Sequence, residues 1–156
     1  MEILLFNTRD ELLRVSLKHV VYFEADGNYT HIYFSNGAKA TLLYSLSHME
    51  HLIDDKLKGK VQPFIRIGKK YIVNSSCVFQ INTLKQKLIL TNFDTPQLYT
   101  LAVSKEALKS LKELIIYGKG PIIDYPNLEH PWKSFRNDIE NGFAEAGSYE
   151  NGKVVQ

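Results

Sequence analysis

The chain has 156 residues, of which 44% are hydrophobic, enough to bury the core of one domain but leaving little room for two. Nineteen lysines and arginines against 17 aspartates and glutamates give a net charge of +2, which argues neither for nor against a nucleic-acid partner. Its single cysteine, Cys77, excludes an internal disulfide, and no apolar run approaches the roughly 20 residues that span a bilayer. We therefore expect a soluble, cytoplasmic protein with no membrane partner.

Short clusters of aromatic and β-branched residues, separated by polar turn residues, predict a mostly β fold of small antiparallel sheets. The predicted strands are 3–6, 12–16, 20–25, 29–34, 38–43, 64–67, 71–73, 78–81, 87–91 and 99–102. Asn36-Gly37 predicts a tight hairpin turn with positive φ angles. Alternation within 29–34 places Tyr29, His31 and Tyr33 on one face of that strand.

In two segments the apolar residues recur at the three- and four-residue spacing of a helix instead of alternating as in a strand. Ser47 and Glu50 have the spacing of a capping box, which predicts a short helix from residue 48 to about 55. Ser104 suits an N-cap, and the leucines that follow it recur at helical spacing, which predicts a second short helix that ends near Ile115. Glycines and prolines become frequent after this helix, so we expect a domain over 1–117 and a C-terminal extension over 118–156.

The extension carries its own amphipathic pattern. Pro131 suits the first turn of a helix, and large apolar residues follow at intervals of three and four residues, which predicts a helix near 131–145. Two interpretations stay open: the helix docks on its own domain, or it binds a protein partner. Because the extension is acidic overall, we expect residues 121–145 to pack on the domain and partly cover a basic surface.

The charge is unevenly distributed along the chain. No acidic residue occurs between Lys56 and Phe93. The basic residues of that stretch are Lys56, Lys58, Lys60, Arg66, Lys69, Lys70, Lys85 and Lys87. Such a distribution is typical of a phosphate-binding surface, whose cations displace the counterions condensed on nucleic acid. Lysine-rich loops that merely face solvent are equally common, so both interpretations remain open at this point.

Patterns for enzymatic chemistry are missing from the sequence. His48 and His51 can share a helix face, but no third metal ligand follows at a suitable spacing. Cys77 has no cysteine–histidine motif around it, and we expect it to be buried in a strand. The glycines are scattered and form no phosphate-binding loop. We therefore predict that the chain is not an enzyme and needs no cofactor.

Two blocks of the sequence carry a family resemblance: residues 20–29, VVYFEADGNY, and residues 64–74, FIRIGKKYIVN. They resemble the LytTR domain of bacterial response regulators, whose blocks are Glu-x-x-Gly-Asn-Tyr, a short helix, Phe-x-Arg-x-His-x-x-Tyr-x-Val-Asn and a final helix that opens with Ser-Arg. All four blocks occur here in this order, over about residues 2 to 115. The chain departs from the pattern at Gly68, where the family has histidine, and at Lys105, where it has arginine.

The resemblance implies a mostly β fold of small antiparallel sheets with two short helices, and a transcription regulator that binds duplex DNA. In the family, loops at the sheet edges enter successive major grooves, which differs from helix-turn-helix docking. Carried over to this chain, the DNA-contacting residues are Asn28, Tyr29, His31, Arg66, Gly68, Lys69, Lys70, Ser104 and Lys105. Lysines can pair with phosphates or guanine acceptors, and the N-terminus of a helix can bind a phosphate.

Alternatives remain for several of these positions. Sheet pleating alone allows Tyr29 and His31 either to reach a base or to pack within the protein. For Arg66 and Asn74 we favour structural roles, with Arg66 bonding neighbouring loops and Asn74 holding a turn. The guanidinium fork that an arginine would present is lost at Lys105, so sequence preference cannot be carried over from the family.

The leading hypothesis is a sequence-specific regulator without a receiver domain, because the resemblance begins at residue 2 and leaves no room for one. We expect it to bind as a homodimer on repeated half-sites. The alternative from another class is a protein-interaction module that keeps the LytTR fold and modulates another regulator. The substituted Gly68 and the acidic, aromatic extension motivate that alternative.

Overall fold

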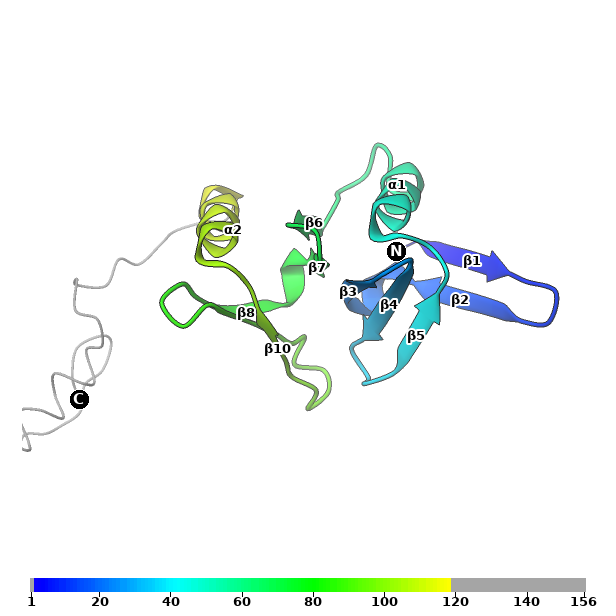
Figure 1. Ribbon diagram of the computed structural model, residues 1–156, viewed down its shortest axis with the longest axis horizontal. Coiled ribbons are helices and arrows are strands. Elements are labelled where there is room, and N and C mark those ends of the chain that lie inside the picture. Colours follow the sequence, from blue (N-terminus) through cyan, green and yellow to red (C-terminus); the bar gives the residue numbers. More distant parts are fainter. Residues whose placement is uncertain (1, 119–156) are drawn as a thin grey trace, which may run out of the picture. The chain divides into compact units, whose positions relative to one another are not determined.

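The computed structural model describes residues 2–118, and the predicted extension helix and its packing lie outside these residues. The described residues form a mostly β fold with two α-helices (Figure 1), as predicted. The strands are β1 (Ile3–Asn7), β2 (Leu12–Ser16), β3 (Val20–Asp26), β4 (Tyr29–Phe34), β5 (Lys39–Leu42), β6 (Phe64–Ile67), β7 (Tyr71–Asn74), β8 (Val78–Asn82), β9 (Lys87–Leu90) and β10 (Tyr99–Ala102). The helices are α1 (Leu46–Lys56) and α2 (Lys105–Gly118). Every predicted strand is confirmed, with ends that differ by at most one residue.

The strands form three antiparallel sheets. β1 and β2 make a hairpin, β5-β4-β3-β7-β6 make a five-stranded sheet, and β10-β9-β8 make a three-stranded sheet. Two 3₁₀ turns that the sequence pattern did not predict, Leu17–His19 and Ser75–Cys77, lead directly into β3 and β8. Each of these two strands begins with a shift in register, at Val20 and at Val78, so the strand is re-aimed where it enters its sheet.

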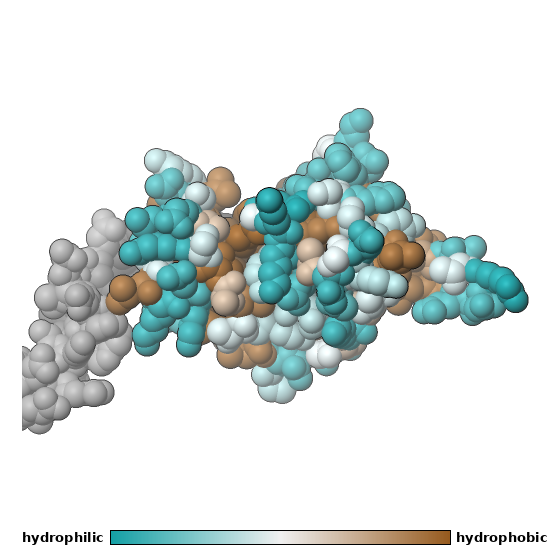
Figure 2. Space-filling view, in the orientation of Figure 1, coloured by the Kyte–Doolittle hydropathy of each residue, from teal (hydrophilic) through white to brown (hydrophobic). Residues whose placement is uncertain are grey.

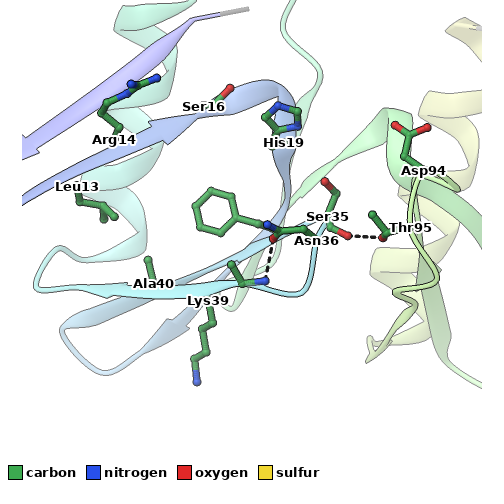
Figure 3. A pocket seen from close by; sticks show the side chains of 12 residues that line it. Leu13, Arg14, Ser16, His19, Ser35, Asn36, Lys39, Ala40, Asp94 and Thr95 are labelled. Carbon is green, nitrogen blue, oxygen red and sulfur yellow. Dashed lines mark hydrogen bonds between the residues drawn. The ribbon is translucent and has the colours of Figure 1, made fainter.

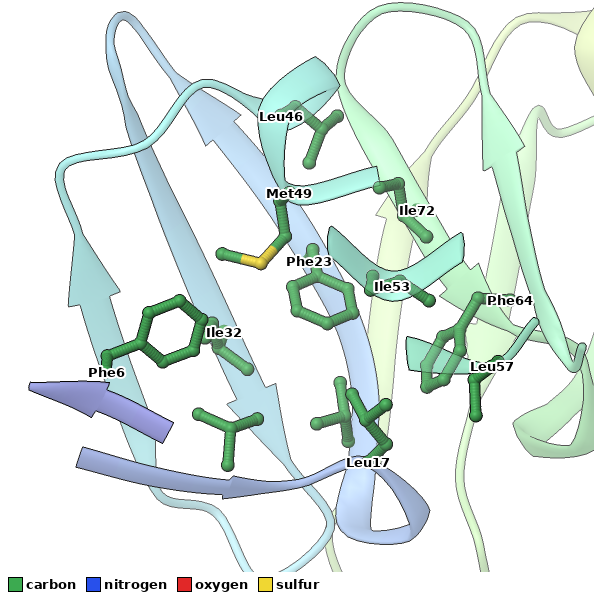
Figure 4. Close-up of a cluster of buried hydrophobic side chains, with 12 residues drawn as sticks. Phe6, Leu17, Phe23, Ile32, Leu46, Met49, Ile53, Leu57, Phe64 and Ile72 are labelled. Carbon is green, nitrogen blue, oxygen red and sulfur yellow. The ribbon is translucent and has the colours of Figure 1, made fainter. Parts of the chain in front are cut away.

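A first hydrophobic core lies between α1, one face of the five-stranded sheet and the β1–β2 hairpin (Figure 4). Phe23 and Ile32 contribute from the sheet, Met49 and Ile53 from the helix, and all four are almost fully buried. Phe23 also meets Phe64 edge to face, with ring centroids 5.7 Å apart. This packing positions α1 across the sheet.

A second core lies on the opposite face of the five-stranded sheet, against the three-stranded sheet and α2. Tyr22 is stacked on Tyr33 with centroids 4.4 Å apart, and its ring meets the edges of Tyr71 and Tyr99. The register shift at Val20 places both Val21 and Tyr22 in this second core. The tyrosines therefore join the two larger sheets, and burial raises the pKa of Tyr22 well above its usual range.

The predicted cap of the first helix is wrong by two residues. Ser45, not Ser47, is the N-cap, and its Oγ accepts a hydrogen bond from the backbone N–H of His48 at 3.1 Å. The helix begins at Leu46, whose side chain is buried in the first core. Glu50 does not close a capping box, because its carboxylate accepts a hydrogen bond from Arg66.

The turn between β4 and β5 has the predicted position but not the predicted φ angles, because Asn36 does not share the positive φ. Only Gly37 has a positive φ, at 91°, and its N–H donates to the carbonyl of Phe34 at 3.0 Å. Asn36 instead uses its side-chain oxygen to accept from the N–H of Ala38 at 2.9 Å. The loop therefore spans three residues and closes with a glycine in the left-handed region, a common hairpin form.

Two further predictions are confirmed in the second half of the domain. Ser104 caps α2, because its Oγ accepts a hydrogen bond from the N–H of Ala107 at 3.2 Å. Cys77 is buried, although in a 3₁₀ turn rather than a strand, and burial raises the pKa of its thiol. None of the helices in residues 2–118 has the length and hydropathy needed to cross a membrane.

Candidate nucleic-acid interface

Two of the three predicted contact segments are turns at one end of the five-stranded sheet. The β3–β4 turn follows the pair Asp26 and Tyr29, and the β6–β7 turn precedes Tyr71, which pairs with Glu24 of β3. A hydrogen bond from the N–H of Ala25, near the end of β3, to the carbonyl of Lys70, at 2.8 Å, ties this strand to the β6–β7 turn. We call this end, with turn residues 27–28 and 68–70, the paired-turn end.

The third predicted segment, the start of α2, adjoins the same end. A small hollow of about 170 Å³ is lined on one side by Gly68, Lys69 and Lys70 and on the other by Val103 and Ser104. The chain folds in this way because α2 packs its buried leucines into the second core, which brings its first turn beside β7. Segments more than 70 residues apart in the sequence thus form one surface.

Arg66 holds the β6–β7 turn against α1. Its Nε donates to the carbonyl of Gly68 at 2.8 Å, and one guanidinium nitrogen donates to Glu50 Oε1 at 2.8 Å. The same nitrogen lies 3.5 Å from Ser47 Oγ. The side chain is only 24% exposed. These contacts confirm that Arg66 bonds neighbouring segments, and its predicted contact with DNA stays a proposal.

Asn74 holds a turn, as predicted, at the opposite end of β7. Its Nδ2 donates to the carbonyl of Val20 at 2.9 Å. Its Oδ1 accepts from the N–H of Ser76 at 3.0 Å and from the Ser76 hydroxyl at 2.6 Å. The side chain is buried, so these bonds fix the start of β3 relative to the 3₁₀ turn that precedes β8.

The side chain of His31 is hydrogen-bonded within the protein, whereas that of Tyr29 is half-exposed. His31 is engaged through both ring nitrogens, because Nδ1 lies 2.8 Å from Thr41 Oγ1 and Nε2 lies 2.8 Å from Asp26 Oδ2. Tyr29 is 48% exposed, next to Asn28 in the turn. The buried residues of β4, Thr30 and Ile32, lie on the other face, which confirms the predicted alternation.

The lysines of the β6–β7 turn are exposed. Lys70 Nζ lies 3.4 Å from Glu24 Oε2. Tyr71 and the Glu24 carboxylate raise the pKa of the Lys70 ammonium above its usual value. Lys69 forms no ion pair within residues 2–118. The turn therefore presents two cations to solvent at the paired-turn end.

Gly68 adopts a backbone conformation that favours glycine, with φ at +60°, and a Cβ added there would meet no atom within 4 Å. Histidine is tolerated in this region better than most residues. We expect Gly68→His to lower the free energy of unfolding by about 1 kcal/mol, the strain of a left-handed residue without a clash. Urea denaturation measures it, with Gly118→His as the control, because Gly118 is equally open and has no positive φ. A loss of stability several times larger would contradict the open surroundings.

A larger hollow, of about 580 Å³, lies at the other end of the five-stranded sheet (Figure 3). The β4–β5 turn lines it together with Leu13, His19 and Asp94. Thr95 closes one side, where its hydroxyl donates to the carbonyl of Ser35 at 2.5 Å. None of the nine predicted DNA-contacting residues lines this hollow. The larger hollow is therefore separate from the candidate interface.

This arrangement of two turns and one helix start on a small β scaffold can be compared with known families. The family model of the LytTr DNA-binding domain matches residues 10–116. The chain belongs to this family. The match includes all nine residues that the resemblance predicted to contact DNA.

One solved structure that is similar to this LytTR chain is the LytTr DNA-binding domain of a protein described as a methyl-accepting/DNA response regulator from Bacillus cereus. The two share 22% sequence identity with a TM-score of 0.52, over 74% of this chain and 97% of that one. At this identity the likeness shows the fold, which agrees with the predicted class. No curated protein matches the chain.

Sequence reasoning missed some of the partners that position the LytTR contact segments. Glu50 was assigned to a helix cap, although it binds Arg66, and Glu24 was not linked with Lys70. Asp26 was not linked with His31 either. One signal was available for the last pair, because Asp26 precedes a tight turn and lies opposite Tyr29, which makes it the diagonal neighbour of His31 on the adjacent strand.

Proposed function

We propose that this chain is a transcription regulator that binds duplex DNA sequence-specifically through the three segments at the paired-turn end. The observation that supports this most is the convergence of those segments, because the fold brings the β3–β4 turn, the β6–β7 turn and the start of α2 together. Membership of a DNA-binding family supports the same partner. On the face shown in Figure 2, hydrophobic patches are small and separated by hydrophilic side chains, as suits a polar partner.

Each segment offers different chemistry to DNA. Lys69 and Lys70 carry charge that can pair with phosphates or with the acceptors of guanine in the major groove. The half-exposed Tyr29 can contact a base or sugar from the β3–β4 turn. Ser104 and Lys105 open α2, whose first N–H groups favour a phosphate. Turns of this kind would enter successive grooves, and two copies would occupy repeated half-sites.

The test is a salt titration of the purified chain against random duplex DNA and against a pool enriched by selection, measured by fluorescence anisotropy. Lys69→Ala and Lys70→Ala are expected to weaken binding and to reduce the slope of log affinity against log salt by about 0.9 for each phosphate that is no longer neutralised by a lysine. Lys18→Ala is the matched control, because Lys18 is exposed in the turn before β3, at the other end of the sheet.

Enrichment of a repeated site, together with steep salt dependence, would support two copies on half-sites. Flat, weak binding that neither lysine substitution changes would contradict the proposal. That result would favour the protein-interaction module instead, and pull-down experiments with the intact chain would then test for a protein partner.

A further inference from the structure

The sequence between Lys56 and Phe93 has basic but no acidic residues, and the fold separates these basic residues into groups that lie at different parts of the domain. Lys56, Lys58 and Lys60 lie at and beyond the end of α1, before Phe64, which pairs with Asn74 at the end of the sheet opposite the paired turns. Lys60 also forms an ion pair with Glu2. This group is therefore remote from the three predicted contact segments.

The lysines of the β8–β9 turn lie elsewhere. Lys87 opens β9 and pairs with Ala102, two residues before the N-cap of α2. The N–H of Val103 donates to the carbonyl of Gln86 at 3.1 Å, which ties the turn directly to the junction between β10 and α2. The β8–β9 turn is thus the immediate neighbour of the predicted contact at the start of α2.

The turn has a defined shape. The Asn82 side-chain oxygen accepts from the N–H of Lys85 at 2.9 Å, and Gln86 takes a left-handed conformation with φ at 55°. Lys85 and Lys87 are both exposed, and neither forms an ion pair with a carboxylate of residues 2–118. Two cations are therefore held beside the helix start without a counter-charge bonded to them.

We propose that Lys85 and Lys87 bind DNA phosphates and that the β8–β9 turn is a fourth contact segment, which the family resemblance does not assign. The inference rests on the proposed function. A duplex bound at the start of α2 would need to extend only past the junction between β10 and α2 to reach this turn, because Val103 is bonded to Gln86. Because the contact is to the backbone, it adds affinity for every sequence and no base preference.

The experiment compares Lys85→Ala/Lys87→Ala with the control double variant Lys18→Ala/Lys58→Ala, which removes the same net charge from exposed positions remote from the paired-turn end. Both are titrated at several salt concentrations against random duplex DNA and against a selected site. The Lys85/Lys87 variant is expected to lose roughly eightfold in affinity per lysine at 0.1 M salt, with a slope lower by about 0.9 for each lysine removed. The loss of affinity should be equal on both DNAs.

The control variant is expected to stay within about twofold of the unaltered chain, since long-range effects of exposed charges are screened at this salt concentration. Equal behaviour of the two double variants, while Lys69→Ala and Lys70→Ala still weaken binding, would overturn the fourth contact alone. A loss of affinity confined to the selected site would overturn the assignment to phosphates. If none of the lysine variants weakens binding, the proposed function itself fails.

Discussion

Asn74→Ala is expected to lower the free energy of unfolding by about 2 kcal/mol, because it leaves the buried carbonyl of Val20 without its hydrogen-bond donor. The carbonyl of Val20 loses its donor, and the N–H and hydroxyl of Ser76 lose their acceptor. Asn74 is 3% exposed and Val20 is fully buried, so water cannot reach this carbonyl without opening the structure, whereas the exposed Ser76 can bond to water instead. Urea denaturation followed by circular dichroism measures the change.

A matched control is Asn36→Ala, which also removes an asparagine side chain that accepts from a backbone N–H two residues further along the chain. Asn36 is exposed, so water replaces the missing bond and the expected cost is about 1 kcal/mol or less. If the two variants unfold at the same urea concentration, the buried hydrogen bonds around Asn74 do not stabilise the fold.

Arg66→Ala is expected to reduce both stability and DNA affinity, the first by about 2 kcal/mol, because charge-assisted hydrogen bonds to Glu50 and to the turn carbonyls disappear. The reduced affinity follows from the freed β6–β7 turn, which carries Lys69 and Lys70. Since Arg66 acts here as a positioning residue, the salt slope should stay close to that of the unaltered chain.

Glu50→Gln separates the two roles of Arg66, because it weakens the anchor on α1 without touching the turn. If Arg66 positions the turn, this variant also weakens DNA binding, and combining it with Arg66→Ala adds little. If Arg66 contacts a phosphate directly, Glu50→Gln leaves the affinity unchanged or raises it, while Arg66→Ala lowers the salt slope. The second pattern would contradict the positioning role.

The strands were predictable because each is a local pattern of apolar, β-branched and aromatic residues between turn residues. β4 shows this well, since alternation alone placed His31 and Tyr33 on the face opposite Ile32. The helices were predictable in position but not in their ends. Ser45 and Ser47 are equally good caps by type, and only the burial of Leu46 decides between them.

The long-range features were not predictable from local patterns. The 3₁₀ turns before β3 and β8 depend on contacts such as Asn74 to Val20, which are 54 residues apart. In the β4–β5 turn, Asn36 has no positive φ and its side chain bonds the backbone, which the dipeptide alone does not reveal. The candidate contact residues came from the family resemblance, whereas their convergence at one end depends on strand order.

The bond between Ala25 and Lys70 has a further consequence for how the two turns can meet a duplex. β3 and β7 are neighbours in a hydrogen-bonded sheet, so the strand ends that lead into the two turns are held about 4.8 Å apart by the backbone rather than by flexible side chains. Substitutions within either turn can then alter which groups are presented while the interval between them stays constant. The backbone therefore fixes this interval. Under the proposed function, substitutions in the turns would change the preferred DNA sequence while the sheet keeps its structure.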